Sequence, residues 1–197
     1  METMPSLPQA PRTITILIVG DSKVGKTTFL SRISQRGSLE GTVSIGMLHD
    51  EDQPFVFQAR RGPKEFRLEF FDTAAPVGWQ NLDPDLVIVC YDISQRMTLI
   101  DMQRAWSKQV MAVFKKDTLP VAVLGLKRDL RSETDPNGII YPEEGTRVAQ
   151  EMRADSYMEC SAITGELLDL VVKDIFSMAL KTTTDTGGQS EGGCSTM

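Results

Sequence analysis

The residues with the clearest chemical potential form the octapeptide GDSKVGKT, which directly follows the apolar segment ITILIV (14–19). A glycine-containing turn between a strand and a helix presents backbone N–H groups to an anion, with the positive end of the helix dipole behind them. Lys26 would reach the β- and γ-phosphates of a nucleotide, and Thr27 would give its hydroxyl to Mg²⁺. The sequence therefore predicts a phosphate-binding loop made of Gly20, Asp21, Ser22, Lys23, Val24, Gly25, Lys26, Thr27 and Thr28.

Further polar segments follow the ends of other apolar runs. FRLEFF (66–71) ends at Asp72, whose carboxylate can accept a hydrogen bond from a water molecule on Mg²⁺. PVAVLGL (120–126) leads into LKRD, and SYMEC (156–160) leads into SAITGE. Asp129 can accept hydrogen bonds from N1 and the exocyclic amine of guanine, a donor pair that adenine does not offer. These segments predict selection of guanine.

Near-continuous apolar segments alternate with amphipathic ones along the chain. Helices are expected at 26–36, 94–114 and 143–153 and in the last stretch before the tail, and strands at 14–19, 54–59, 66–71, 85–91, 120–126 and 156–160. This order predicts an α/β fold with a mostly parallel sheet, helices on both faces, and ligands at the carboxyl ends of the strands. The adjacent segments 54–59 and 66–71 can form a hairpin that supplies one antiparallel edge.

Bulk composition narrows the partners and the compartment. The net charge of −6 favours neither nucleic acid nor an anionic bilayer surface as a general partner. The three cysteines form no evident pairing pattern, and the first residues lack the regions of a signal peptide, so we expect a cytoplasmic protein. We expect a flexible segment at 1–12, one folded domain at 13–180 and a disordered tail at 181–197.

Over nearly all of 13–180 the chain resembles the Ras-superfamily small GTPases, through the phosphate loop, DTA (72–74), KRD (127–129) and ECSA (159–162). It is most similar to the Rho branch, through DLR (129–131), YPEEGTRVAQEM (141–152) and YMECSAITGE (157–166). Within that branch it resembles an atypical, fungal-type member. The resemblance implies the P-loop NTPase fold with a six-stranded sheet, GTP or GDP as ligand, and Mg²⁺ as cofactor.

The same resemblance assigns roles to single residues. Lys127 would lie over the base, Asp129 would read guanine, and the backbone of Ser161 and Ala162 would help to recognise the guanine carbonyl. Thr42 is the best match to the threonine of the first switch loop, which binds Mg²⁺ in the GTP state. Its spacing to Thr27 and Asp72 differs from the family pattern, so a solvated loop threonine remains the alternative. The implied metal set is thus Thr27, Thr42 and, through water, Asp72.

Two kinds of departure from the family bear on activity. Ala75 and Pro76 stand where the family has a glycine and the glutamine that orients the attacking water, and proline has no group for that task. With Lys26 they make up the catalytic positions, and slow or impaired GTP hydrolysis is expected. Leu126 replaces a polar residue near the base, which predicts a weaker hold on guanine.

Two segments are expected to contact other proteins, and the tail a membrane. The resemblance implies that effectors and regulators bind the switch segments 37–50 and 72–84. The terminal Cys194-Ser-Thr-Met resembles a prenylation box, and a single prenyl chain gives weak, reversible membrane attachment. An unmodified thiol is the alternative. The two tryptophans, Trp79 and Trp106, are interpreted as core or partner surface.

Three functions remain open at this level. The first is a Rho-like switch that binds GTP and GDP and hydrolyses slowly. The second is a pseudo-GTPase that acts as a constitutive protein-interaction module, which Ala75 and Pro76 favour. The third is a P-loop ATPase or small-molecule kinase, and the KRD and SAI segments argue against it.

Overall fold

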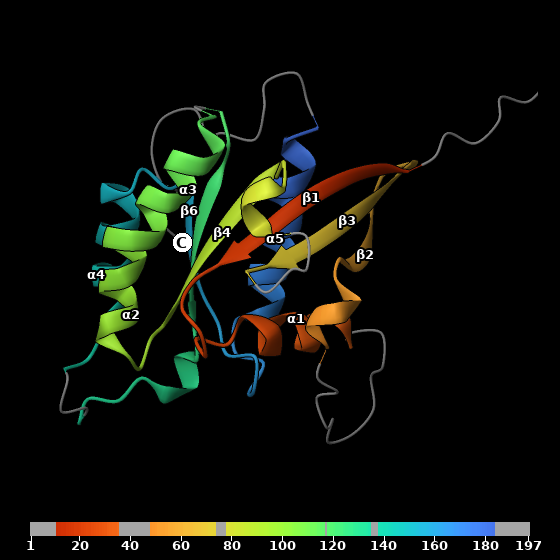
Figure 1. Cartoon of the computed structure of the whole chain (residues 1–197). Coiled ribbons are helices and arrows are strands. Elements are labelled where there is room, and N and C mark those ends of the chain that lie inside the picture. Colours follow the sequence, from red (N-terminus) through yellow and green to blue (C-terminus); the bar gives the residue numbers. More distant parts are fainter. Residues whose placement is uncertain (1–10, 36–47, 74–77, 117, 135–137, 184–197) are drawn as a thin grey trace, which may run out of the picture.

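The computed structural model describes residues 11–35, 48–73, 78–116, 118–134 and 138–183 (Figure 1). Within them lies a six-stranded sheet with the order β2-β3-β1-β4-β5-β6. Its strands are β1 (Arg12–Val19), β2 (Phe55–Arg61), β3 (Lys64–Asp72), β4 (Leu86–Asp92), β5 (Val121–Leu126) and β6 (Ser156–Glu159). β2 pairs with β3 in antiparallel register and forms the edge, whereas the other neighbouring strands run parallel. The predicted fold class and its antiparallel hairpin are therefore confirmed.

Helices cover both faces of the sheet (Figure 1). α1 (Lys26–Ser34) and α5 (Leu168–Lys181) pack on one face, and α2 (Arg96–Asp101), α3 (Ser107–Phe114) and α4 (Pro142–Glu151) pack on the other. A hydrophobic core lies on each face of the sheet, because successive side chains of β1 point to opposite faces. Ile16 and Ile18 point to α1 and α5, whereas Leu17 points to the opposite layer of helices. Val19 points the same way as Leu17. Every residue of β4 is buried, as expected for a central strand covered on both sides.

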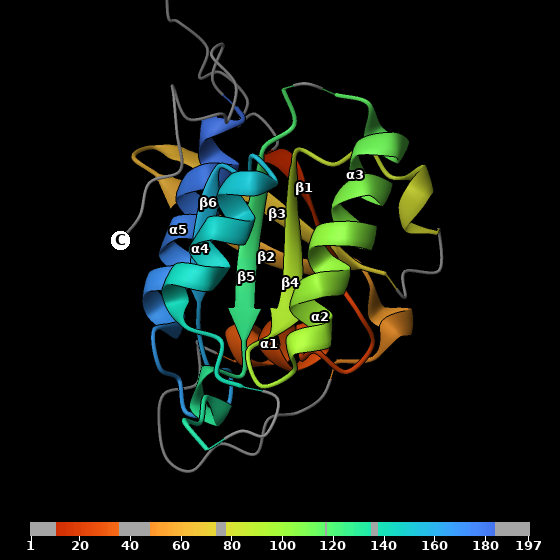
Figure 2. The ribbon, with the colours of Figure 1, turned by 90° about the vertical axis from the view of Figure 1, so that its left-hand side faces the viewer.

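Short helical turns complete the described structure: η1 (Asp50–Asp52), η2 (Trp79–Asn81), the π-helical turn η3 (Met102–Trp106) and η4 (Arg128–Leu130). Figure 2 shows the arrowheads of β4 and β5 pointing toward the end of the domain at which α1 lies. The loops that follow β1, β4, β5 and β6 therefore gather at one end of the domain. None of the helices in the described ranges is long and apolar enough to cross a membrane.

The helix predicted near 94–114 is confirmed, but it begins at Arg96 and contains an irregular turn. Helix α2 begins at Arg96, because the backbone N–H and the hydroxyl of Ser94 both bind the carboxylate of Asp92 at 2.8 and 2.7 Å and hold Ser94 in a turn. The middle of the segment is the π turn η3, where the N–H of Ser107 bonds to the carbonyl of Met102. Other predicted elements differ from the observed ones only by small shifts at their ends.

Candidate functional site

The phosphate loop joins β1 to α1 in a backbone conformation that depends on glycine. Gly20 has φ +144° and Gly25 has φ +111°, both in the region that side chains disfavour. A Cβ on Gly20 would lie 2.4 Å from the carbonyl oxygen of Cys90, so β4 approaches this loop more closely than any side chain allows. Gly25 is the N-cap of α1, and no side chain in the described part of the chain caps that end by a hydrogen bond. The backbone N–H groups in the first turn of α1 can thus bind an anion.

Lys26 lies inside this loop. Its side chain is 8% exposed, and its ammonium group donates to the carbonyl oxygens of Gly20 at 2.8 Å and Asp21 at 2.9 Å. The ammonium is thereby held over the curve of the loop, where it can meet the phosphates of a nucleotide. The loop geometry and the position of Lys26 both fit a polyphosphate.

Asp72 ends β3 beside the phosphate loop, since it pairs in register with Ile18 of β1. It is buried at 2% exposure, and Gln53 binds it twice. The amide nitrogen of Gln53 donates to Asp72 Oδ1, and the backbone N–H of Asp72 donates to Gln53 Oε1, both at 2.9 Å. Gln53 thus fixes the orientation of the carboxylate that is expected to bind water on Mg²⁺.

No cluster of three or more His, Cys, Asp or Glu residues in the described ranges is arranged to hold a metal alone. Mg²⁺ at nucleotide sites commonly keeps several waters and takes its other ligands from one or two side chains and the phosphates. The side chains available for it here are those of Thr27 and Asp72. This donor set fits Mg²⁺ held jointly with a nucleotide, rather than a metal site formed by protein groups alone.

A lysine joins the loop after β5 to the phosphate loop. Lys127, at φ +59°, donates to the carbonyl oxygen of Lys23 at 2.7 Å and to Asp92 Oδ2 at 2.7 Å. Asp92 is buried at the end of β4, and its other oxygen accepts the two hydrogen bonds from Ser94. Because the methylene stem of Lys127 would lie 3.6 Å from a Cβ on Gly25, the lysine runs along the phosphate loop.

The two loops expected to bind the base are joined by backbone hydrogen bonds. The N–H of Arg128 donates to the carbonyl of Cys160 at 3.2 Å, and the N–H of Cys160 donates to Gly125 at 3.0 Å. Asp129 is exposed on one loop, whereas Ser161 and Ala162 are buried on the other. Within the second loop, the hydroxyl of Ser161 accepts from the N–H of Thr164 at 3.0 Å. Both loops are thus held in place from within the protein.

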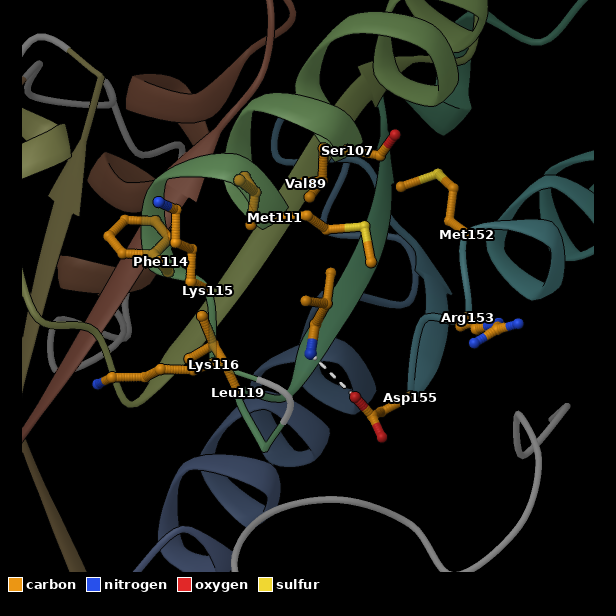
Figure 3. A pocket seen from close by; sticks show the side chains of 12 residues that line it. Val89, Ser107, Met111, Phe114, Lys115, Lys116, Leu119, Met152, Arg153 and Asp155 are labelled. Carbon is orange, nitrogen blue, oxygen red and sulfur yellow. Dashed lines mark hydrogen bonds between the residues drawn. The ribbon is translucent and has the colours of Figure 1, made fainter.

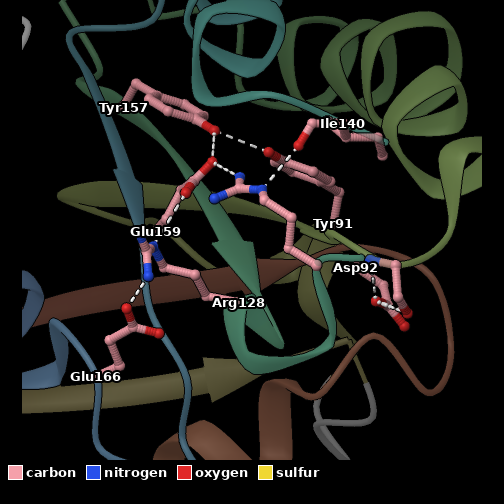
Figure 4. Close-up of polar contacts among 9 residues, drawn as sticks. Tyr91, Asp92, Arg128, Ile140, Tyr157, Glu159 and Glu166 are labelled. Atoms are coloured by element: carbon pink, nitrogen blue, oxygen red, sulfur yellow. Dashed lines mark hydrogen bonds and ion pairs between the residues drawn. The ribbon is translucent and has the colours of Figure 1, made fainter. Parts of the chain in front are cut away.

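A buried polar network lies beneath these base loops (Figure 4). The hydroxyl of Tyr157 donates to Glu159, and the hydroxyls of Tyr157 and Tyr91 are 2.8 Å apart. Glu159 also pairs with Arg131, and Arg128 lies 3.5 Å from its second carboxylate oxygen. Burial raises the pKa of both tyrosines, so they stay neutral. The network holds the ends of β4 and β6 and the segment 128–131 in a fixed relation.

The pKa of Cys90, whose carbonyl oxygen lies close to Gly20, responds to burial and to the charges of Lys26 and Asp72. Burial raises the pKa of the Cys90 thiol to about 12, while the charge of Lys26 lowers it and Cys160 and Asp72 raise it. Both Lys26 and Asp72 therefore act on the same point of β4. Cys90 is a neutral packing residue and not a nucleophile.

A separate cavity of about 400 Å³ lies between α3 and the segment that follows α4 (Figure 3). Apolar side chains such as Met111, Phe114 and Met152 line it, together with the charged side chains of Lys115 and Arg153. It includes no residue of the phosphate loop or of the base loops, so it is not assigned to the nucleotide.

The structure brings together most of the predicted site residues. Those at 20–28, Lys127, Asp129, Ser161, Ala162 and Asp72 all lie at one end of the domain, and Leu126 is buried as part of the core. Thr42, Ala75, Pro76 and Cys194 lie outside the described residues. Sequence reasoning missed Gln53 and Asp92, which position Asp72 and Lys127. Asp92 ends an apolar strand and could have been noticed, whereas nothing near Gln53 in the sequence marks it.

The sequence of this chain is similar to those of known proteins. The sequence matches the Ras family over residues 15–185. GTP-binding protein RHO2 of Saccharomyces cerevisiae is 27% identical over 183 residues, which cover 85% of this chain and 87% of that protein. GTP-binding protein RHO4 of Eremothecium gossypii is 29% identical over 181 residues, or 86% of this chain and 64% of that protein. Rho-related GTP-binding protein RhoH of Mus musculus is 27% identical over 177 residues, which are 86% of each.

Proposed function

Because the chain belongs to the Ras family, we propose that it is a Rho-like signalling switch that binds GTP and GDP together with Mg²⁺. One observation carries the proposal: Lys127 donates a hydrogen bond to the carbonyl oxygen of Lys23, so the phosphate loop and the base loop lie against each other. A nucleotide would use both loops at once, because its phosphates would bind the phosphate loop and its base would bind the base loop. The similarity to Rho-type GTP-binding proteins supports guanine as the base.

Each part of the site has a stated task in this proposal. The N-terminal N–H groups of α1 and the ammonium of Lys26 neutralise the phosphates. Thr27 and Asp72 support Mg²⁺, with Thr42 as the proposed additional ligand in the GTP state. Asp129 accepts hydrogen bonds from guanine, and the backbone at Ser161 and Ala162 reads its carbonyl. The bound GTP supplies the phosphoanhydride bond whose loss would end the active state.

Guanine selectivity is tested by competition against a fluorescent guanine nucleotide. GTP should displace the probe, and ATP should fail at concentrations far above those at which GTP succeeds. Asp129→Asn should shift preference toward xanthosine nucleotides, because the amide donates to the exocyclic carbonyl of xanthine. The matched control is Glu133→Gln, which removes one exposed carboxylate from a nearby position and should change nothing. Competition by ATP as effective as that by GTP would reject the proposal.

Slow hydrolysis is the second part of the proposal, and it rests on Ala75 and Pro76. Loss of a group that positions water costs on the order of 3 kcal/mol of transition-state stabilisation, or about a hundredfold in rate. Ala75→Gly with Pro76→Gln should therefore raise the single-turnover rate of GTP hydrolysis. Gln80→Ala is the control, since Gln80 is exposed in the same segment and offers another amide. An ordinary wild-type rate that falls on Gln80→Ala would assign the role to Gln80.

A pseudo-GTPase that acts as a constitutive interaction module is the second candidate, and Ala75 and Pro76 favour it. Both candidates use the segments 37–50 and 72–84 as binding surfaces for effectors and regulators. They differ in whether binding of a partner depends on the nucleotide. A pull-down with the protein loaded with GDP or with a non-hydrolysable GTP analogue separates them, since only the switch discriminates between the two states.

Weak membrane attachment from the cytoplasmic face is proposed through prenylation of Cys194. One prenyl chain, without a basic cluster or a second cysteine, gives only partial and reversible binding. Fractionation of cells that express wild type, Cys194→Ser or the control Ser195→Ala tests this. Only Cys194→Ser should leave the membrane fraction, and an unmodified terminus by mass spectrometry would reject the idea. The domain is proposed to span 13–180 and the tail 181–197.

A further inference from the structure

The side chain of Trp106 contacts two segments that belong to different parts of the proposed site. Its indole N–H donates to Asp21 Oδ1 in the phosphate loop at 2.7 Å. Its ring lies 6.2 Å from the ring of Trp79, centroid to centroid, at an interplanar angle of 53°. Trp79 is 7% exposed and begins η2, inside the segment 72–84. A single side chain thus connects the loop that would hold phosphates with the segment that would contact partners.

The π turn η3 explains how Trp106 reaches both neighbours. A hydrogen bond from residue 107 back to residue 102 encloses one residue more than a regular α-helical turn. Each residue of an α-helix turns the chain by about 100°, so one extra residue changes the face on which the later side chains lie. Trp106 is the last residue of η3. The irregularity therefore helps to set the direction of its ring, and π turns of this kind occur frequently at functional sites.

We propose that Trp106 is a positioning residue that couples the phosphate loop to the segment 78–82 through Asp21 and Trp79. The coupling rests on the proposed function, because it gives the nucleotide a route to a partner-binding segment. The carboxylate of Asp21 stands on the loop that would receive a polyphosphate, and like charges repel. Trp106 gives that carboxylate a fixed donor. A change in the position of Asp21 then moves the indole, and the packed ring of Trp79 must adjust.

Indole N–H signals in proton–nitrogen NMR spectra test this link directly. The chain has two tryptophans and hence two such signals, which Trp79→Phe and Trp106→Phe assign. Asp21→Ala should move the signal of Trp106, because its acceptor is lost, and also that of Trp79. With Trp106→Phe in place, Asp21→Ala should leave the Trp79 signal where it was. Asp21→Asn keeps an acceptor oxygen, so both signals should stay close to their wild-type positions.

The rate at which a fluorescent GDP dissociates gives a second measure. Trp106→Phe should accelerate release by about tenfold, the worth of one hydrogen bond to a charged group, because it leaves the carboxylate of Asp21 beside the phosphates without its indole donor. Asp21→Ala removes that carboxylate together with the bond, so Trp106→Phe should cause no further acceleration when Asp21→Ala is already in place. Phe114→Leu is the matched control, since the ring of Phe114 packs on Trp79 at 6.1 Å. It should move the Trp79 signal and leave GDP release unchanged.

Two results would overturn the coupling. One is a Trp79 signal that ignores Asp21→Ala, or that responds equally with and without Trp106. The other is an acceleration of GDP release by Trp106→Phe that is as large with Asp21→Ala in place as without it. Absence of guanine nucleotide binding would reject the proposed function instead, and the NMR comparison would still decide the coupling. Where Trp106→Phe fails to fold, Asp21→Ala and Asp21→Asn are compared with both tryptophans present. A Trp79 signal that does not move with Asp21→Ala, or that moves equally with Asp21→Asn, overturns the coupling.

Discussion

Removal of a single oxygen atom, by Tyr157→Phe, should destabilise the network beneath the base loops. The hydroxyl of Tyr157 has one hydrogen, which it donates to Glu159, so the hydroxyl of Tyr91 must be the donor in the 2.8 Å contact between the tyrosines. Phenylalanine thus removes one bond to a carboxylate and one acceptor for a buried hydroxyl. Tyr91→Phe is the matched control, because it removes only the bond between the two tyrosines.

The magnitudes of the two changes differ enough to be measured. A bond to a charged group contributes about 1.5–3 kcal/mol and a neutral one about 1 kcal/mol. Because Glu159 keeps its pair with Arg131, we expect Tyr157→Phe to lower the free energy of unfolding by about 2–3 kcal/mol. Tyr91→Phe should cost about 1 kcal/mol. In a domain of this size these losses correspond to roughly 4–12 °C and 2–4 °C in Tm.

Thermal and urea unfolding at one fixed GDP concentration measure both losses, since bound ligand itself shifts the transition. The double variant Tyr91→Phe with Tyr157→Phe should lose little more than Tyr157→Phe alone, because the two changes remove one shared bond. Equal losses for the two single variants would refute the reasoning, since Tyr157 would then make no extra contribution through Glu159. Strict additivity in the double variant would refute the shared bond.

Three other variants or conditions probe the same region. Gly145→Ala should destabilise the protein by about 1–3 kcal/mol in urea unfolding, because its Cβ would lie 2.2 Å from the hydroxyl of Tyr157; a gain in stability would contradict the packing. The thiols of Cys90 and Cys160 have pKa values raised by burial from 9.0 to about 12, so the unfolded chain releases their protons first and stability should fall as pH rises above about 9. Unfolding followed by circular dichroism between pH 8 and 11 checks this, and a flat profile would contradict it. Asp92→Asn removes the charge that pairs with Lys127 and should accelerate GDP release by about tenfold in the fluorescence assay. An unchanged rate would show that this ion pair does not position Lys127.

Much of the fold could be predicted because its strands are covered on both sides. A segment such as LVIVCYD has to be apolar along its whole length when both faces of a central strand are buried, and that pattern is visible in the sequence. Parallel order then places the carboxyl ends of the strands at one edge. The phosphate loop, Asp72 and Asp129 were predicted together for this reason.

The remaining parts depend on contacts that leave no local mark. The apolar spacing of Leu99, Met102 and Trp106 fits a regular helix, and the extra residue in η3 does not alter it, so the π turn was not foreseen. Gln53 binds Asp72 across 19 positions in the chain, and only the folded sheet brings them together. Likewise, the bond between Trp106 and Asp21 spans 85 positions.

The most direct test of the central claim is the identity of the nucleotide that co-purifies with the protein. The full chain is purified in the presence of Mg²⁺, denatured, and its released nucleotides are separated by chromatography. The proposed switch predicts GDP or GTP at close to one nucleotide per chain, and loss of that nucleotide on Lys26→Ala. Release of ATP or ADP, or a chain that carries no nucleotide and takes up no added GDP, would contradict it.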